Sequence, residues 1–155
     1  MYNNKGFMQS SKNIQQRQDE NDKLPPLVLV DEVGNLKEVV LTSMAQKQAQ
    51  KISGSKISTS QLRAFFNEFK AIKNRLDEEG KNFPSIYPMI LMIDSKIAYR
   101  AKKDRKMEEF KAFINQGIAY IMEENRKGKG FEAFRDFLMY FEAVVGYSYG
   151  LGLKD

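Results

Sequence analysis

The sequence contains neither cysteine nor histidine, and these two absences limit the chemistry open to it. Without cysteine there can be no disulfide and no thiolate metal site, which fits the reducing cytoplasm where we expect the protein to reside. Without histidine the chain lacks the usual general base near neutral pH and the commonest metal ligand. We therefore expect no metal site and no cofactor.

Long apolar runs are missing as well. The longest are five residues, as in Met89–Ile93 and Phe137–Phe141, whereas a membrane-spanning helix needs about 20 apolar residues. The N-terminus is polar and lacks the apolar stretch of a secretory signal. The sequence therefore predicts a soluble protein without a membrane partner.

The carboxylates do not form the pattern of a catalytic site. They occur as adjacent residues in Asp77–Glu79, Glu108–Glu109 and Glu123–Glu124, and adjacent residues on a helix point to different sides. Gly128-Lys129-Gly130 is a lone G-x-G, and such a short motif indicates a helix stop rather than a phosphate-binding loop. These patterns predict that the protein is not an enzyme.

Positive charge is present, and one segment concentrates it. The formal net charge of the chain is +5. Between residues 96 and 106 six cations stand against a single anion, Asp104. Such a local cluster is typical of a phosphate-binding surface, although a solvated helix face without a ligand is the alternative. The six cations are Lys96, Arg100, Lys102, Lys103, Arg105 and Lys106. The spacing i, i+4, i+7 places Lys96, Arg100 and Lys103 on one face of a helix.

The chain begins with a polar segment. Ten of the first 23 residues are Asn, Gln or Ser, so residues 1–26 are predicted to be a disordered tail that cannot bury enough apolar surface to fold. The remainder, 27–155, is predicted to form one helical-bundle domain. At its start, valine-rich runs flank Gly34-Asn35 and indicate a small hairpin over residues 27–41, with a loose extended segment as the alternative.

Helix signals dominate the rest of the sequence. Ser43 with Gln46, and Ser58 with Gln61, predict capping boxes that start the first and second helices, near residues 43–53 and 59–80. Prolines 84 and 88 mark the entry to a third helix, a fourth begins near residue 104, and a fifth runs from residue 131 to about 147. The fold class is therefore all-α, a single bundle of about five helices.

Two helices have unusually wide apolar faces. The third is apolar almost all round from Ile86 to Ile93, which predicts that its first half is buried. The fifth carries an aromatic stripe widened by Phe137 and Val144, which suits either the core or a homodimer interface. Tyr99 lies within the basic segment, where it could stack on a base; we expect it to be core instead.

Three stretches together resemble one family. They are residues 58–65, 96–103 and 134–147, and their order and spacing resemble the small helical subunit of type III-A CRISPR effector complexes, the Csm complexes, over roughly residues 36–150. The resemblance implies a non-catalytic subunit that lines the crRNA–target RNA duplex. It also implies self-association as copies stacked in a filament, beside the homodimer that the wide apolar face of the fifth helix suggests. The implied partners are crRNA, single-stranded target RNA and other Csm subunits.

The resemblance also implies particular RNA-binding residues. The arginine of the family's S-x-L-R element matches Arg63, and the basic residue after its Y-x-A element matches Lys103, with Lys96 one turn before Tyr99. The long polar tail departs from the family pattern. Taken with the basic cluster, the candidate RNA-binding residues are Arg63, Lys96, Arg100, Lys102 and Lys103.

Two other functions fit parts of the sequence. A helical protein–protein adaptor would use its aromatic faces for a partner, and its lysines would only solubilise it. A helix-turn-helix DNA regulator would use the helix after Ser58, whose exposed face offers mainly Arg63, Asn67, Lys70 and Asn74. That set is thin for reading bases.

Overall fold

A computed structural model of the protein describes residues 24–78, 80 and 82–153. The predicted polar tail, residues 1–26, lies outside the described residues except for 24–26. Within the described ranges the chain is helical and has no strand, which confirms the all-α class. The helices are a π-helical turn η1 (Val40–Met44), α2 (Ala45–Gly54), α3 (Thr59–Glu78), α4 (Phe83–Lys103), a 3₁₀ turn η2 (Arg105–Met107), α5 (Glu108–Arg126) and α6 (Gly130–Gly150).

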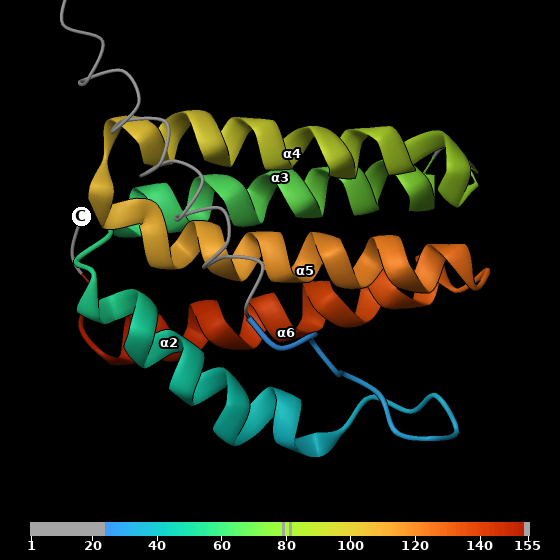
Figure 1. Ribbon diagram of the computed structural model, residues 1–155, viewed down its shortest axis with the longest axis horizontal. Coiled ribbons are helices and arrows are strands. Elements are labelled where there is room, and N and C mark those ends of the chain that lie inside the picture. Colours follow the sequence, from blue (N-terminus) through green and yellow to red (C-terminus); the bar gives the residue numbers. More distant parts are fainter. Residues whose placement is uncertain (1–23, 79, 81, 154–155) are drawn as a thin grey trace, which may run out of the picture.

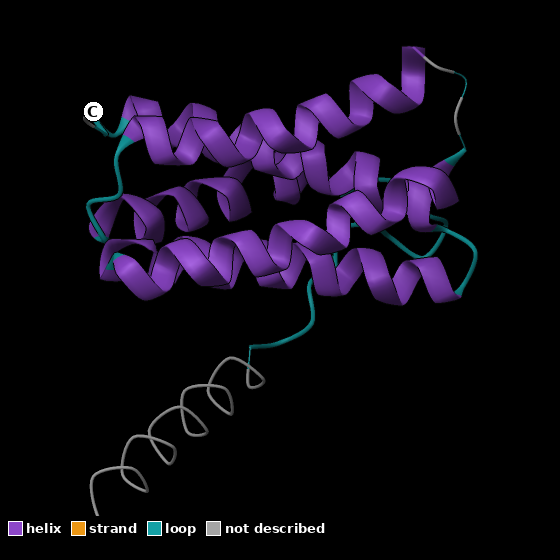
Figure 2. Cartoon of the chain, turned by 90° about the horizontal axis from the view of Figure 1, so that it is seen from above, coloured by secondary structure: helices purple, strands orange, loops and turns teal. Residues whose placement is uncertain are grey.

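The four long helices α3 to α6 form a bundle in which each packs against two others (Figure 1). Helix α4 packs against α3 and α5, and α6 packs against α5 and α3. Figure 2 shows these helices side by side along one axis. The shorter α2 crosses the bundle obliquely and packs mainly against α6. Short connections between consecutive helices are typical of such a bundle.

Phenylalanine rings fill the centre of the bundle. Ring centroids of Phe113 and Phe141 are 5.2 Å apart, and those of Phe69 and Phe137 are 5.6 Å apart, separations at which aromatic pairs attract each other. The wide apolar face of α6 is thus buried against the chain's own helices, so its width no longer argues for a homodimer. The phenylalanines buried to within 2% exposure are Phe65, Phe69, Phe110, Phe113, Phe134, Phe137 and Phe141.

Helices α5 and α6 are in close contact where α5 has a glycine. A Cβ atom at Gly117 would lie 2.1 Å from Cζ of Phe137, far inside van der Waals contact. The absence of a side chain on α5 therefore makes room for the Phe137 ring on α6. This close approach fixes how the two helices are aligned along their length.

The first helix begins earlier than the sequence predicted. Helical backbone starts at Glu38, and Ser43 lies inside the π-turn instead of capping the helix. The π-turn has a physical reason: Val40 and Ala45 are both buried, and they are five residues apart, a spacing that one π-turn brings to the same face. The predicted capping box at Ser43 is therefore wrong, whereas the predicted end near residue 53 is confirmed.

The segment before this helix makes a tight turn with a single bridge. Val30 and Leu36 form one antiparallel β-bridge. Between them, the Asp31 carboxylate accepts hydrogen bonds from the backbone N–H groups of Val33 (3.0 Å) and Asn35 (2.9 Å). Gly34 has a φ of 87°, which favours glycine. The predicted hairpin is reduced to this turn, because no described residue around it is in a strand.

The capping box at the start of α3 is confirmed. Ser58 Oγ accepts a hydrogen bond from the backbone N–H of Gln61 at 3.1 Å, and Gln61 Oε1 accepts one from the backbone N–H of Ser58, also at 3.1 Å. The neighbouring Ile57 and Leu62 are both buried, as expected of a hydrophobic staple. Beyond the helix, Gly80 has a φ of 61°.

Replacing Ser58 with alanine should lower the free energy of unfolding by about 1 kcal/mol, because the cap satisfies backbone donors that would otherwise have no partner. The measurement is urea unfolding followed by circular dichroism. Ser43→Ala is the matched control, since Ser43 has the same sequence signature but lies exposed inside the π-turn, and its effect should stay within about 0.5 kcal/mol. Equal losses for both variants would contradict the assignment.

Helix α4 begins as predicted. The Asn82 side chain caps it by accepting a hydrogen bond from the backbone N–H of Ser85 at 3.3 Å. Pro84 occupies the first turn, where a proline removes no helical hydrogen bond. Pro88 lies one turn further inside the helix.

The predicted all-round burial of the first half of α4 is wrong. Only one stripe of the helix is buried, and Met92 keeps 60% of its side-chain surface exposed. The reason is that α4 packs mainly against α3 and α5, its two neighbours on one side. The buried stripe consists of Phe83, Ile86, Ile90, Ile93, Ile97 and Ala101.

The passage from α4 to α5 matches the expectation for the fourth helix. Asp104 accepts a hydrogen bond from the backbone N–H of Lys106 at 3.1 Å and so caps the 3₁₀ turn. Glu108 and Glu109 then lie in the first turn of α5, where negative charge is favourable. At the far end, Gly128 has a φ of 77°, which confirms the predicted helix stop. The apolar stripe of this segment is buried and consists of Met107, Phe110, Ile114, Ile118 and Ile121.

Candidate nucleic-acid interface

Helices α3 and α4 carry the candidate basic surface, and a hydrogen bond joins them at one end. The Gln61 side-chain amide, in the first turn of α3, donates to Asp104 Oδ2 just after α4, at 2.9 Å. This hydrogen bond and the one from the Lys106 backbone hold the pKa of Asp104 below its ordinary value. The one anion of the basic segment therefore stays ionised and is engaged by neighbouring donors.

Two of the predicted cations lie along the edge of α4 that faces α3. Lys96 Nζ is 3.1 Å from Glu68 Oε2, and the guanidinium carbon of Arg100 is 5.1 Å from the centroid of the Phe65 ring. Lys96 is exposed and Glu68 is partly exposed, and ion pairs near the surface contribute about 0–1 kcal/mol. A phosphate can therefore compete for Lys96 at little energetic cost.

Lys103 lies on the same side of α4 as Lys96 and Arg100. At about 100° per residue, these three positions span roughly 60° around the helix axis, as the spacing predicted. The Lys103 ammonium donates to Tyr99 Oη and lies 4.4 Å from the centroid of the Tyr99 ring. We call this set, Lys96, Arg100 and Lys103, the α4 basic face.

Lys102 does not belong to the α4 basic face. It is exposed, but six residues after Lys96 it lies about 120° around the helix axis. Its side chain therefore points to a different part of the surface. Lys102 is therefore close to the α4 basic face in sequence but lies on another side of the helix.

Arg63 is also separate from the α4 basic face. Its Nε donates to Tyr149 Oη at 3.1 Å, and its guanidinium carbon is 5.6 Å from the Tyr149 ring centroid. Tyr149 belongs to the last turn of α6, so Arg63 turns toward α6. Gln61 and Glu68, which contact the α4 side, lie on the other side of α3. The structure thus divides the five predicted residues among three places: the α4 basic face, the exposed position of Lys102, and the contact of Arg63 with α6.

The structure corrects the expectation for Tyr99. Its side chain is 62% exposed, so it is not part of the core. Sequence reasoning did not pick out Met92 and Tyr149 as surface neighbours of the predicted cations. Met92 could have been found from its spacing, because Met92, Lys96, Tyr99 and Lys103 follow one another at i, i+4, i+7 and i+11. Nothing local in the sequence indicated the contact between Tyr149 and Arg63.

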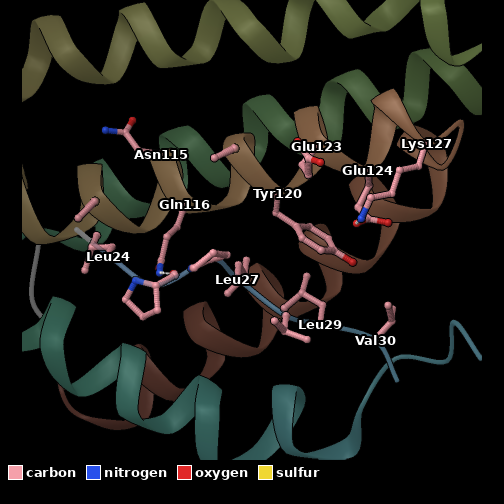
Figure 3. A pocket seen from close by; sticks show the side chains of 15 residues that line it. Leu24, Leu27, Leu29, Val30, Asn115, Gln116, Tyr120, Glu123, Glu124 and Lys127 are labelled. Carbon is pink, nitrogen blue, oxygen red and sulfur yellow. Dashed lines mark hydrogen bonds and ion pairs between the residues drawn. The ribbon is translucent and has the colours of Figure 1, made fainter. Parts of the chain in front are cut away.

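A cavity of about 630 Å³ lies elsewhere, between the segment from residue 24 to 30 and helix α5 (Figure 3). Gln116 Nε2 donates to the backbone oxygen of Pro25 at 3.0 Å and ties the segment to the helix. Burial, with the charges of Glu124 and Asp136, raises the pKa of Tyr120 in this wall to about 12. Leucine, valine and proline side chains provide much of the lining, and among the described residues that line it Lys127 is the only cation. This composition does not suit a phosphate chain.

The fold and the α4 basic face define a small helical-bundle protein with cations gathered on one helix. Its described residues hold no cluster of carboxylates that could bind a metal ion. The family model for Csm2 Type III-A matches residues 35–150, which is most of the chain, and the protein belongs to this family. It is therefore a small subunit of a type III-A Csm effector complex, and other Csm subunits are its partners.

The family membership confirms the resemblance drawn from residues 58–65, 96–103 and 134–147. Neither a curated protein nor a solved structure matches the chain. None of the helices in the described ranges is long and apolar enough to cross a membrane.

Proposed function

We propose that the protein is a non-catalytic RNA-binding subunit that lines the crRNA–target RNA duplex of its complex in the cytoplasm. The observation that carries this proposal is the α4 basic face, three cations held on one side of a rigid helix. A-form RNA is recognised mostly through its backbone phosphates and its shape. Such binding requires cations at fixed spacing and no catalytic side chain.

The chemistry of each cation suits this role. The guanidinium carbon of Arg100 lies over the Phe65 ring, 5.1 Å from its centroid, a contact that uses none of the N–H donors of the group. These donors lie at the edge of the group and pair with phosphate oxygens. Lys96 and Lys103 act as point charges on flexible stems, so they can follow a backbone that is not exactly regular.

Arg63 contributes at a second point in this proposal. Its hydrogen bond to Tyr149 and its position over the tyrosine ring restrict the guanidinium, so less entropy is lost when it meets a phosphate. Arg63 faces α6, whereas the α4 basic face lies on α4. Arg63 and the α4 basic face would therefore contact different stretches of RNA. Copies of the subunit stacked along the complex would bring such stretches together.

The adaptor alternative has lost its main support. It required a wide aromatic face available to a partner, and that face of α6 is buried against α2, α3 and α5. The α4 basic face, by contrast, remains on the surface, and its positive charge favours RNA.

The salt dependence of RNA binding tests the proposal. For single strands the slope of log affinity against log salt is about −0.7 per phosphate neutralised, so contact with three to five phosphates gives roughly −2 to −3.5. We expect this slope for the purified protein titrated against single-stranded RNA between low and moderate salt, with little dependence on sequence. An affinity that does not change with salt would refute electrostatic RNA binding.

A further inference from the structure

Tyr99 is the most exposed aromatic side chain among the described residues, at 62%. It projects from α4 within the basic segment. Isolated exposed apolar groups are common on protein surfaces and need no explanation. Tyr99 differs because of its neighbours, which alternate in character along one row of the helix.

The row runs Met92, Lys96, Tyr99 and Lys103, at the i, i+4, i+7, i+11 spacing that places side chains one above another on a helix. Met92 is 60% exposed, almost as much as Tyr99. The lysines flank the tyrosine on both sides along the axis, about 10 Å apart in helical rise. An exposed ring between two cations is the arrangement that single-stranded nucleic-acid sites use, with bases stacked on aromatic rings and phosphates held by cations.

The contact between Lys103 and Tyr99 gives the ring a defined geometry. The ammonium donates to the hydroxyl and lies 4.4 Å from the ring centroid, close enough for a cation–π attraction. It therefore occupies one side of the ring and restrains the ring's orientation. The exposed surface of Tyr99 is then the part that a flat ligand can cover.

We propose that Tyr99 is a nucleobase-stacking site for single-stranded RNA, with Lys96 and Lys103 contacting the phosphates on either side of the stacked base. This inference rests on the proposed RNA-binding function and adds to it a contact with bases. Every base has a π-face, so stacking strengthens binding without selecting a sequence. The site distinguishes an unpaired base from a base within a duplex, because a paired base is already stacked on its neighbours.

The test compares Tyr99→Ala with the unaltered full-length protein on three RNAs of equal length: a single strand, an abasic strand and a duplex. Because the variant loses the ring on which a base would stack, we expect affinity for the single strand to fall about tenfold, about 1.4 kcal/mol. Affinities for the abasic strand and the duplex should change less than twofold, because neither offers an unpaired base. The salt slope should be unchanged.

Two matched variants complete the experiment. Tyr99→Phe keeps the ring and should bind the single strand within twofold of the unaltered protein. Met139→Ala removes another exposed apolar side chain, 43% exposed on α6, and should have no effect on RNA binding. Circular dichroism checks that each variant keeps its helix content.

The outcomes separate the two proposals. Salt-dependent binding of the unaltered protein combined with no loss for Tyr99→Ala overturns stacking and leaves the proposed function intact. An equal loss on the single strand and the abasic strand also overturns stacking, because Tyr99 would then act only by positioning Lys103. If the unaltered protein binds none of the RNAs, the proposed function fails and stacking fails with it.

Discussion

Phe137→Ala is expected to lower the free energy of unfolding by about 3–5 kcal/mol, the range found when a buried phenylalanine is truncated. The ring is completely buried and lies 5.4 Å from Phe113 and 5.6 Å from Phe69 between centroids. Alanine would leave a cavity beside Gly117, between α5 and α6. Since small domains are stable by about 5–15 kcal/mol, the variant should lose a large part of its stability in urea unfolding.

Met139→Ala is the control for this experiment. Met139 lies two residues further along the same helix, is 43% exposed, and should change the free energy of unfolding by no more than about 0.5 kcal/mol. Comparable losses for the two variants would show that the Phe137 ring is not a central part of the core. RNA affinity of Phe137→Ala should fall only in proportion to the unfolded fraction.

Replacing Lys96, Arg100 and Lys103 together with alanine is expected to weaken binding of single-stranded RNA at least tenfold, about 1.4 kcal/mol. If each cation neutralises one phosphate, the salt slope should become less steep by about 2. Helix content should be retained, because alanine is the best helix former. Stability should fall slightly, since the contact of Arg100 with Phe65 contributes about 0.5–1 kcal/mol at an exposed site.

The matched control removes the same charge elsewhere. Changing Lys47, Lys51 and Arg126 to alanine also lowers the net charge by three, at exposed positions on α2 and at the end of α5. This variant should lose far less affinity than the one altered on the α4 basic face. If the variant altered on the α4 basic face binds RNA like the unaltered protein, α4 is not the RNA surface, and Lys127 and Lys129 become the next candidates.

The long helices could be predicted because their signals are local. The capping box of Ser58 and Gln61, the proline in the first turn of α4 and the glycine after α5 act within a few residues of the helix ends. The start of the first helix could not be predicted in this way, because it depends on the burial of two residues that are five positions apart. Val40 and Ala45 reach the same face only through a π-turn, and a search for 3.6-residue periodicity does not include a five-residue spacing.

The candidate site could be predicted only in part, for a similar reason. The common face of Lys96, Arg100 and Lys103 follows from helix geometry alone. The exposure of Tyr99 and the turning of Arg63 toward Tyr149 depend on which helices pack beside α3 and α4. The sequence of α4 does not indicate which side of the helix its neighbours cover, because its first half is apolar on most sides.

The packing of α2 against α6 has a consequence for how the chain folds as it is synthesised. Residues 55–129 separate these two helices, and a ribosome adds roughly 5–20 residues per second. Synthesis of helix α2 is therefore complete about 4–15 s before synthesis of its main partner begins. During this interval the face of α2 that later packs against α6 exposes little apolar surface, since its buried side chains are two alanines and one isoleucine: Ala45, Ala49 and Ile52. Helix α2, whose main partner is synthesised last, thus presents little apolar surface to which chaperones or neighbouring nascent chains could bind.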